Sequence, residues 1–166
     1  MFDLKRLSSD AIDRSLAKAE HYRLLNEPEQ AESICLDALT ISPNNQRALV
    51  VLLLALTDQF PHGPADSVSR ATEILPRLDG EYERAYYAGI VSERQANARL
   101  LVGTGSAAAF AYSLFCKAMT FYERAEELSP TGNEDALLRW NTCARQIMRH
   151  RLAPAVDDIR EPLMLE

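Results

Sequence analysis

The chain has 166 residues, of which 47% are hydrophobic and 25% are charged, with only 6 glycines and 8 prolines. This composition excludes a disordered or fibrous chain, and the length suits a single domain that buries its own core without disulfides or metal. The formal net charge of −6 argues against a nucleic-acid-binding protein, because neutralising phosphates needs clustered lysine and arginine in excess.

The cysteines and the apolar segments predict the cellular compartment of the protein. Cys35, Cys116 and Cys143 are widely spaced, and each lies among apolar neighbours on a helical pattern, which predicts buried thiols in a reducing compartment. The first ten residues lack an apolar stretch of signal-peptide length, and the longest apolar run, Ala48 to Leu56, is too short to span a bilayer. We therefore expect a cytoplasmic protein without a membrane partner.

Apolar residues recur at intervals of three and four along almost the whole chain, which predicts an all-α fold. Ser8 or Ser9 is expected to cap the first helix. Pro28 suits the first turn of the second helix, which ends before Pro43. The first four predicted helices cover about 9–26, 28–42, 45–59 and 64–75.

Two longer helices follow, at about 80–102 and 106–128, and are predicted to form a hairpin. In the fifth helix, the small residues Ala85 and Gly89 allow a neighbour to approach closely. The sixth carries the most regular packing seam, so we expect Phe121 in the core. The seam residues are Ala107, Phe110, Ala111, Leu114, Ala118, Phe121, Ala125 and Leu128.

A seventh helix at about 133–149 completes a single domain that we place at residues 1–152. It offers four side chains to the same core. Residues 153–166 are predicted to be an irregular tail, because its prolines favour extended backbone. Three large apolar residues near its end suggest a docking segment, with a frayed terminus as the alternative. The core candidates of the helix are Leu137, Trp140, Ala144 and Ile147, and the docking candidates are Leu163, Met164 and Leu165.

The stretch GTGS, between the fifth and sixth helices, raises the question of a phosphate-binding loop. Such a loop normally follows a strand and carries further glycines or a lysine, whereas this stretch follows a predicted helix. We interpret Gly103 as the left-handed residue that ends the fifth helix, and Ser106 as the N-cap of the sixth.

No combination of residues predicts catalysis. His21, His62 and His150 share no ligand spacing with one another or with a cysteine, so no zinc site is expected. The helical register places no Cys/His or Ser/His pair together. We therefore expect a protein that is not an enzyme and that uses no metal or cofactor.

An internal repeat links the second and sixth helices. "AESICLDALTISP", from Ala31, and "AMTFYERAEELSP", which begins 87 residues later at Ala118, share alanines at their first and eighth positions and both end in Ser-Pro. The alanines let a partner helix come close, and the proline ends the helix. This pattern resembles the tetratricopeptide repeat (TPR), a helix-turn-helix unit of about 34 residues. The matching positions of the first unit are Ala19, Tyr22, Asn26, Ala31, Cys35, Ala38 and Pro43.

The later units depart from the family pattern. The second, at about 46–78, is degenerate, and the third has its turn at Gly103 to Gly105, which lengthens both of its helices. The resemblance covers roughly residues 10–150. It implies a TPR-like right-handed stack of antiparallel helix pairs, with a lengthened third hairpin and a terminal capping helix.

Proteins of this family bind peptides or other proteins along the concave face formed by the first helix of each pair. The resemblance therefore implies a non-enzymatic scaffold or adaptor. Four arginines among the groove positions favour an acidic ligand, although a solvated helix face is the alternative for each residue. By register with the family, the groove candidates are Leu16, Glu20, Arg23, Arg47, Val50 and Leu54, continued on the fifth helix by Arg84, Tyr87 and Arg94.

Some uses of the family are disfavoured and two other function classes stay open. The clamp for a peptide C-terminal carboxylate needs Lys and Asn where this chain has Leu16 and Glu20, so the resemblance does not imply it here. One open alternative is a secretion-type chaperone that holds an unfolded client. The other is a structural homo-oligomer, in which the groove or the long hairpin packs against a second copy.

Overall fold

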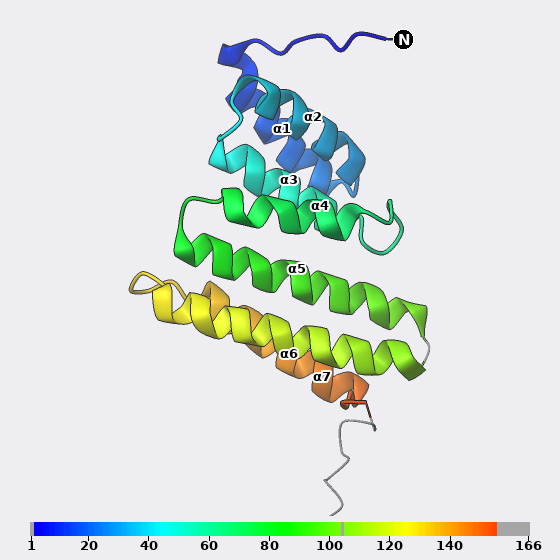
Figure 1. The fold of residues 1–166 in the computed structure, drawn as a ribbon. Helices are drawn as coiled ribbons and strands as arrows, with labels where there is room; N and C mark the ends of the chain where they lie inside the picture. Colours follow the sequence, from blue (N-terminus) through cyan, green and yellow to red (C-terminus); the bar gives the residue numbers. More distant parts are fainter. Residues whose placement is uncertain (1, 104, 156–166) are drawn as a thin grey trace, which may run out of the picture.

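The computed structural model describes residues 2–103 and 105–155, and within these ranges the chain is all-helical, with no strand (Figure 1). Each helix packs against its neighbours along the chain. The predicted all-α class is confirmed. The α-helices of the described residues are α1 (Ile12–Leu24), α2 (Pro28–Ile41), α3 (Gln46–Asp58), α4 (Ser67–Ile74), α5 (Glu81–Val102), α6 (Gly105–Leu128) and α7 (Asp135–His150). None of them combines the length and the apolar character that a membrane crossing requires.

Prolines and glycines lie at the boundaries of the helices largely as predicted. Pro28 lies in the first turn of α2, and Gly103 closes α5 with φ +71°, a left-handed conformation that glycine adopts without steric cost. Two cap predictions are wrong. The Ser8 side chain makes no capping hydrogen bond, and Ser106 lies inside α6, because that helix already begins at Gly105.

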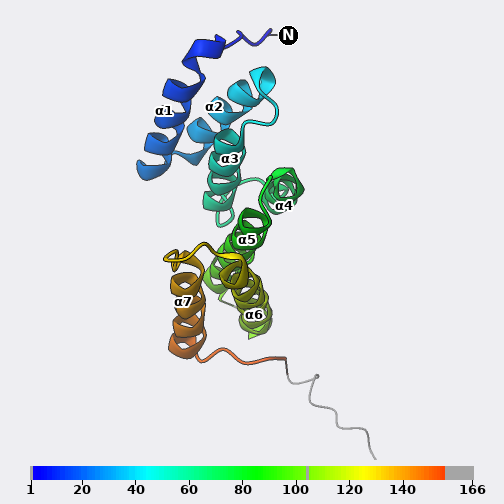
Figure 2. The ribbon, with the colours of Figure 1, turned by 90° about the vertical axis from the view of Figure 1, so that its left-hand side faces the viewer.

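The odd- and even-numbered helices lie on different sides of the molecule (Figure 2). Seen from this direction, α2, α4 and α6 lie to the right, and α1 and α7 project to the left. Helices α3 and α5 lie between α1 and α7, so the odd-numbered helices follow the inside of an arc. We call this the inner side of the molecule.

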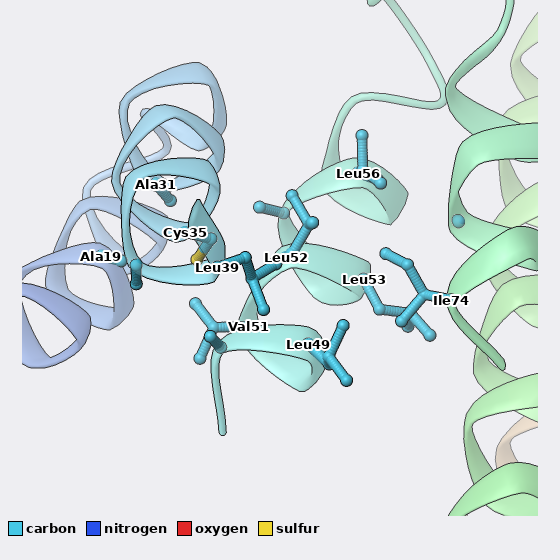
Figure 3. Close-up of a cluster of buried hydrophobic side chains, with 14 of the residues drawn as sticks. Ala19, Ala31, Cys35, Leu39, Leu49, Val51, Leu52, Leu53, Leu56 and Ile74 are labelled. Atoms are coloured by element: carbon cyan, nitrogen blue, oxygen red, sulfur yellow. The ribbon is translucent and has the colours of Figure 1, made fainter. Parts of the chain in front are cut away.

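The core consists of two hydrophobic clusters that meet between α3 and α5. In the first, Cys35 and Leu39 of α2 face Leu52 of α3 (Figure 3). The second fills the space between α5, α6 and α7. Leu54 and Tyr87 pack against both clusters, so the core continues from α1 to α7.

The alanine pattern shared by α2 and α6 occupies equivalent places in the packing. The alanines that we tied to close helix approach are fully buried in both helices, and so is the larger residue four positions after the first alanine. These residues are Ala31, Cys35 and Ala38 in α2, and Ala118, Tyr122 and Ala125 in α6.

Most of the predicted packing seam of α6 is buried, but its phenylalanines do not lie in the core. The buried seam residues are Ala107, Ala111, Leu114, Ala118 and Ala125. Phe110 is 46% exposed and Phe121 is only partly buried, whereas Phe115 and Tyr122 are fully buried. The sequence does not decide between Phe121 and Tyr122, because both are large aromatic residues at adjacent positions. Packing of α6 between α5 and α7 selects the second one, so the expectation that Phe121 is a core residue is wrong.

Helix α7 shows a similar shift. Ala136 and Cys143 are its buried residues, while Trp140 and Ile147 are partly buried and pack against the second cluster. Leu137, which we expected in the core, is 37% exposed. The small buried residues bring α7 close to α6 and leave several of its larger side chains at the surface.

Close packing of the long hairpin depends on Gly89. A β-carbon at this position would lie 2.4 Å from Cε1 of Tyr122, well inside van der Waals contact. Although alanine is the better helix former, we expect Gly89→Ala to lower the free energy of unfolding by about 1–3 kcal/mol, because the ring must move. Urea denaturation measures the change. Unchanged or greater stability would mean that the Tyr122 ring does not lie against α5.

Candidate binding pocket

A carboxylate at the end of α3 joins three helices of the inner side. Asp58 Oδ2 accepts a hydrogen bond from Nε of Arg23, in α1, at 2.7 Å. Its Oδ1 accepts from Nη1 of Arg94, in α5, at 3.2 Å. The Asp58 side chain is only 18% exposed, so these pairs are less screened by water than pairs on an open surface. They fix α1, α3 and α5 relative to one another.

A second carboxylate joins α5, α6 and α7. Glu93 is 3% exposed. Its Oε2 accepts from the Tyr122 hydroxyl at 2.6 Å and its Oε1 from Nη1 of Arg139 at 3.1 Å. Burial, reinforced by the adjacent carboxylate, raises the pKa of Tyr122, so the hydroxyl remains a donor. Sequence analysis missed Glu93, although it lies seven residues after Tyr86 on the buried face of α5.

The inner side is hollowed beside these two carboxylates. The hollow, which we call the inner pocket, has a volume of about 490 Å³ and lies between the end of α3, the second half of α5 and α7. Both carboxylates and their partners Arg94 and Arg139 line it, so these four charged groups are already positioned by the fold. The other lining residues are Thr57, Pro61, Asn97, Ala98, Leu100, Leu101, Gln146, Arg149 and His150.

Three of the predicted groove arginines are neutralised within the chain. Arg23 and Arg94 share Asp58. Arg47 makes a bidentate pair with Glu20, in which both N···O distances are 2.9 Å. The hydrogen bond from Arg47 lowers the pKa of Glu20, so this carboxylate stays ionised. These arginines therefore tie the inner helices together, and only Arg94 among them lines the inner pocket.

The fourth arginine is held elsewhere. Arg84 Nη1 donates to the main-chain carbonyls of Leu78 and Asp79, at 2.6 and 3.0 Å. It therefore secures the connection that leads into α5. The predicted acidic ligand would need the four arginines to form one cluster of free cations. They do not form such a cluster.

The apolar groove candidates belong to the packing. Leu16 is fully buried, so it cannot contact a ligand, and this prediction is corrected. Val50, Leu54 and Tyr87 are partly buried and pack against the core clusters. Of the nine predicted groove residues, Arg94 alone lines the inner pocket. The docking candidates Leu163, Met164 and Leu165 lie outside the described residues.

The thiols follow the prediction in two cases out of three. Cys35 and Cys143 are buried, and burial raises the pKa of each to about 12. Cys116 is only partly buried. The two buried thiols are therefore neutral packing groups at physiological pH.

Comparison of the chain with family models, with curated proteins and with solved structures finds no match. The chemistry of the inner pocket is therefore the basis for assigning a function.

Proposed function

We propose that this protein is a non-enzymatic scaffold or adaptor that holds a segment of another protein against its inner side. The inner pocket is the observation that carries the proposal. Three helices from different parts of the chain build it, and ion-paired, carboxamide and apolar side chains lie next to one another on its surface. A polypeptide presents the same mixture of charged, hydrogen-bonding and apolar groups.

The resemblance to the tetratricopeptide repeat supports the same proposal. In that family the first helix of each pair lines the ligand-binding face, and α1, α3 and α5 lie on the inner side here (Figure 2). We propose a TPR-like right-handed stack in which α5 and α6 form a lengthened third hairpin and α7 covers its end. The buried alanines of α2 and α6 have the packing role that such a repeat requires.

A photo-crosslinking amino acid introduced at Asn97, in the inner pocket, tests the proposal. On irradiation in native cytosol, we expect a discrete adduct with one protein. That partner protein, purified in its folded form, should bind to this chain again. The matched control carries the same amino acid at Thr72, which is exposed on α4 on the other side of the molecule (Figure 2), and should give no adduct.

The outcomes separate the function classes. An adduct with a second copy of this chain would favour the structural homo-oligomer. A set of many proteins that bind only when unfolded would favour the chaperone. Equal adduct yields at Asn97 and Thr72 would contradict a binding site on the inner side.

A further inference from the structure

We infer that the inner pocket selects an extended, acidic polypeptide segment, with its carboxylates at Arg149 and Arg145 and an apolar side chain on Leu101. This inference rests on the proposed function and names the chemistry of its ligand. It also moves the site from the first helix pairs, where the sequence resemblance places it, to the end formed by α7.

The arginines of the inner side differ in how their charges are compensated. Arg23, Arg47 and Arg94 pair with Asp58 or Glu20, and Arg139 pairs with Glu93. On α7, Arg145 and Arg149 are exposed and take part in none of the ion pairs within residues 2–103 and 105–155. Among the arginines that line the two hollows, the uncompensated positive charge therefore lies at α7, within a protein of formal net charge −6.

The two arginines form one continuous surface with the pocket. They are four residues apart, so they lie on neighbouring turns of the same helix face. Arg149 lines the inner pocket, and both arginines line a second hollow of about 340 Å³ on α7. Gln146 borders both hollows, so the two adjoin. Successive acidic residues of one segment can reach both guanidinium groups, whose hydrogen bonds to carboxylates are charge-assisted.

The pocket also offers hydrogen-bonding groups for a peptide backbone. Asn97 of α5 and Gln146 of α7 line it, and no side-chain hydrogen bond occupies either of them in the part of the chain that the structure describes. A carboxamide both donates and accepts, which matches the N–H and C=O groups of an extended chain. A helical ligand already satisfies those groups internally, so these side chains favour an extended one.

Leu101 provides an apolar contact beside the cations. Its side chain is 69% exposed and borders the inner pocket together with Leu100. An apolar ligand residue packed here removes exposed leucine surface from water. The ligand is therefore expected to carry an apolar residue close to its acidic ones.

The buried carboxylates disfavour a ligand of the opposite charge, that is, a basic one. Both oxygens of Glu93 are occupied by Tyr122 and Arg139, and both oxygens of Asp58 accept from arginines. A basic ligand would gain little from these carboxylates, because arginines already compensate their charge. An acidic ligand leaves them intact, so the pocket discriminates by the sign of the charge.

The test uses a fluorescein-labelled synthetic decapeptide, Gly-Glu-Asp-Leu-Glu-Pro-Leu-Asp-Glu-Gly, titrated with the full chain. We expect saturable binding that weakens as salt is added, because salt screens the charge interactions. The analogue with Gln and Asn in place of Glu and Asp should bind at least about tenfold more weakly, since hydrogen bonds to charged groups are lost. Arg149→Glu should cause a loss of similar size, Arg149→Gln a smaller one, and Leu101→Ser a modest one.

Arg14→Glu, the same charge change at an exposed position of α1, is the control and should bind the peptide like the unmodified protein. Circular dichroism melting checks that each variant is folded. Equal affinity for the acidic and neutral peptides, or equal losses in Arg149→Glu and Arg14→Glu, would overturn the inference. A specific adduct from the Asn97 position would still support the scaffold function, so the two failures are distinguishable.

Discussion

Glu93→Ala is expected to lower the free energy of unfolding by about 3–5 kcal/mol, the usual cost of removing one partner of a buried ion pair. The carboxylate is 3% exposed and accepts hydrogen bonds from α6 and α7. Without it, the buried Tyr122 hydroxyl loses its acceptor, and the partly buried Arg139 guanidinium loses its carboxylate partner. Urea denaturation measures the change, followed through the fluorescence of Trp140, the single tryptophan.

Two variants control for this effect. Glu93→Gln keeps a hydrogen-bonding group of the same size without the charge, so it should cost less than Glu93→Ala. Glu126→Ala removes an exposed carboxylate from α6 and should change stability by no more than about 0.5 kcal/mol. If Glu93→Ala and Glu126→Ala unfolded at the same urea concentration, the Glu93 carboxylate would have to be solvated, and the packing of α5 described above would be wrong.

Phe115→Ala is the second substitution with a large expected effect, about 3–5 kcal/mol, because it leaves a cavity between the long helices. Phe115 is fully buried, whereas Phe121 is partly buried and its ring lies 5.9 Å from the Lys117 ammonium. Phe121→Ala, a change of the same size on the same helix, should cost only about 1 kcal/mol. Thermal and urea unfolding of the two variants compare the two faces of α6. A larger loss of unfolding free energy for Phe121→Ala would mean that Phe121 faces the core, as the sequence predicts.

Much of the fold could be predicted because its determinants are local. Pro28 and Gly103 fix helix ends through their own backbone preferences. Small residues such as Ala31, Ala118 and Gly89 mark close helix contacts whatever the partner helix is. The aromatic core residues of α6 could not be predicted, because Phe121 and Tyr122 are neighbours and either can face the core. That choice depends on how α5 and α7 pack around the helix.

The candidate site was harder to predict, because its interactions cross long stretches of sequence. The pair of Arg23 with Asp58 spans 35 residues, and the pair of Glu93 with Arg139 spans 46. Residue type alone identifies an arginine but does not show whether a carboxylate already compensates it. Arg23 and Arg47 were therefore expected to be free, whereas the uncompensated Arg149 on α7 was not a candidate.

Hydrogen exchange can locate the bound partner on the protein. Exchange is measured by mass spectrometry for the full chain, alone and in complex with the protein captured from the Asn97 position. We predict slower exchange in the second half of α5 and in α7, the segments that line the inner pocket, and unchanged exchange in α2 and α4. Slower exchange confined to α2 and α4, with α5 and α7 unchanged, would contradict a binding function for the inner side.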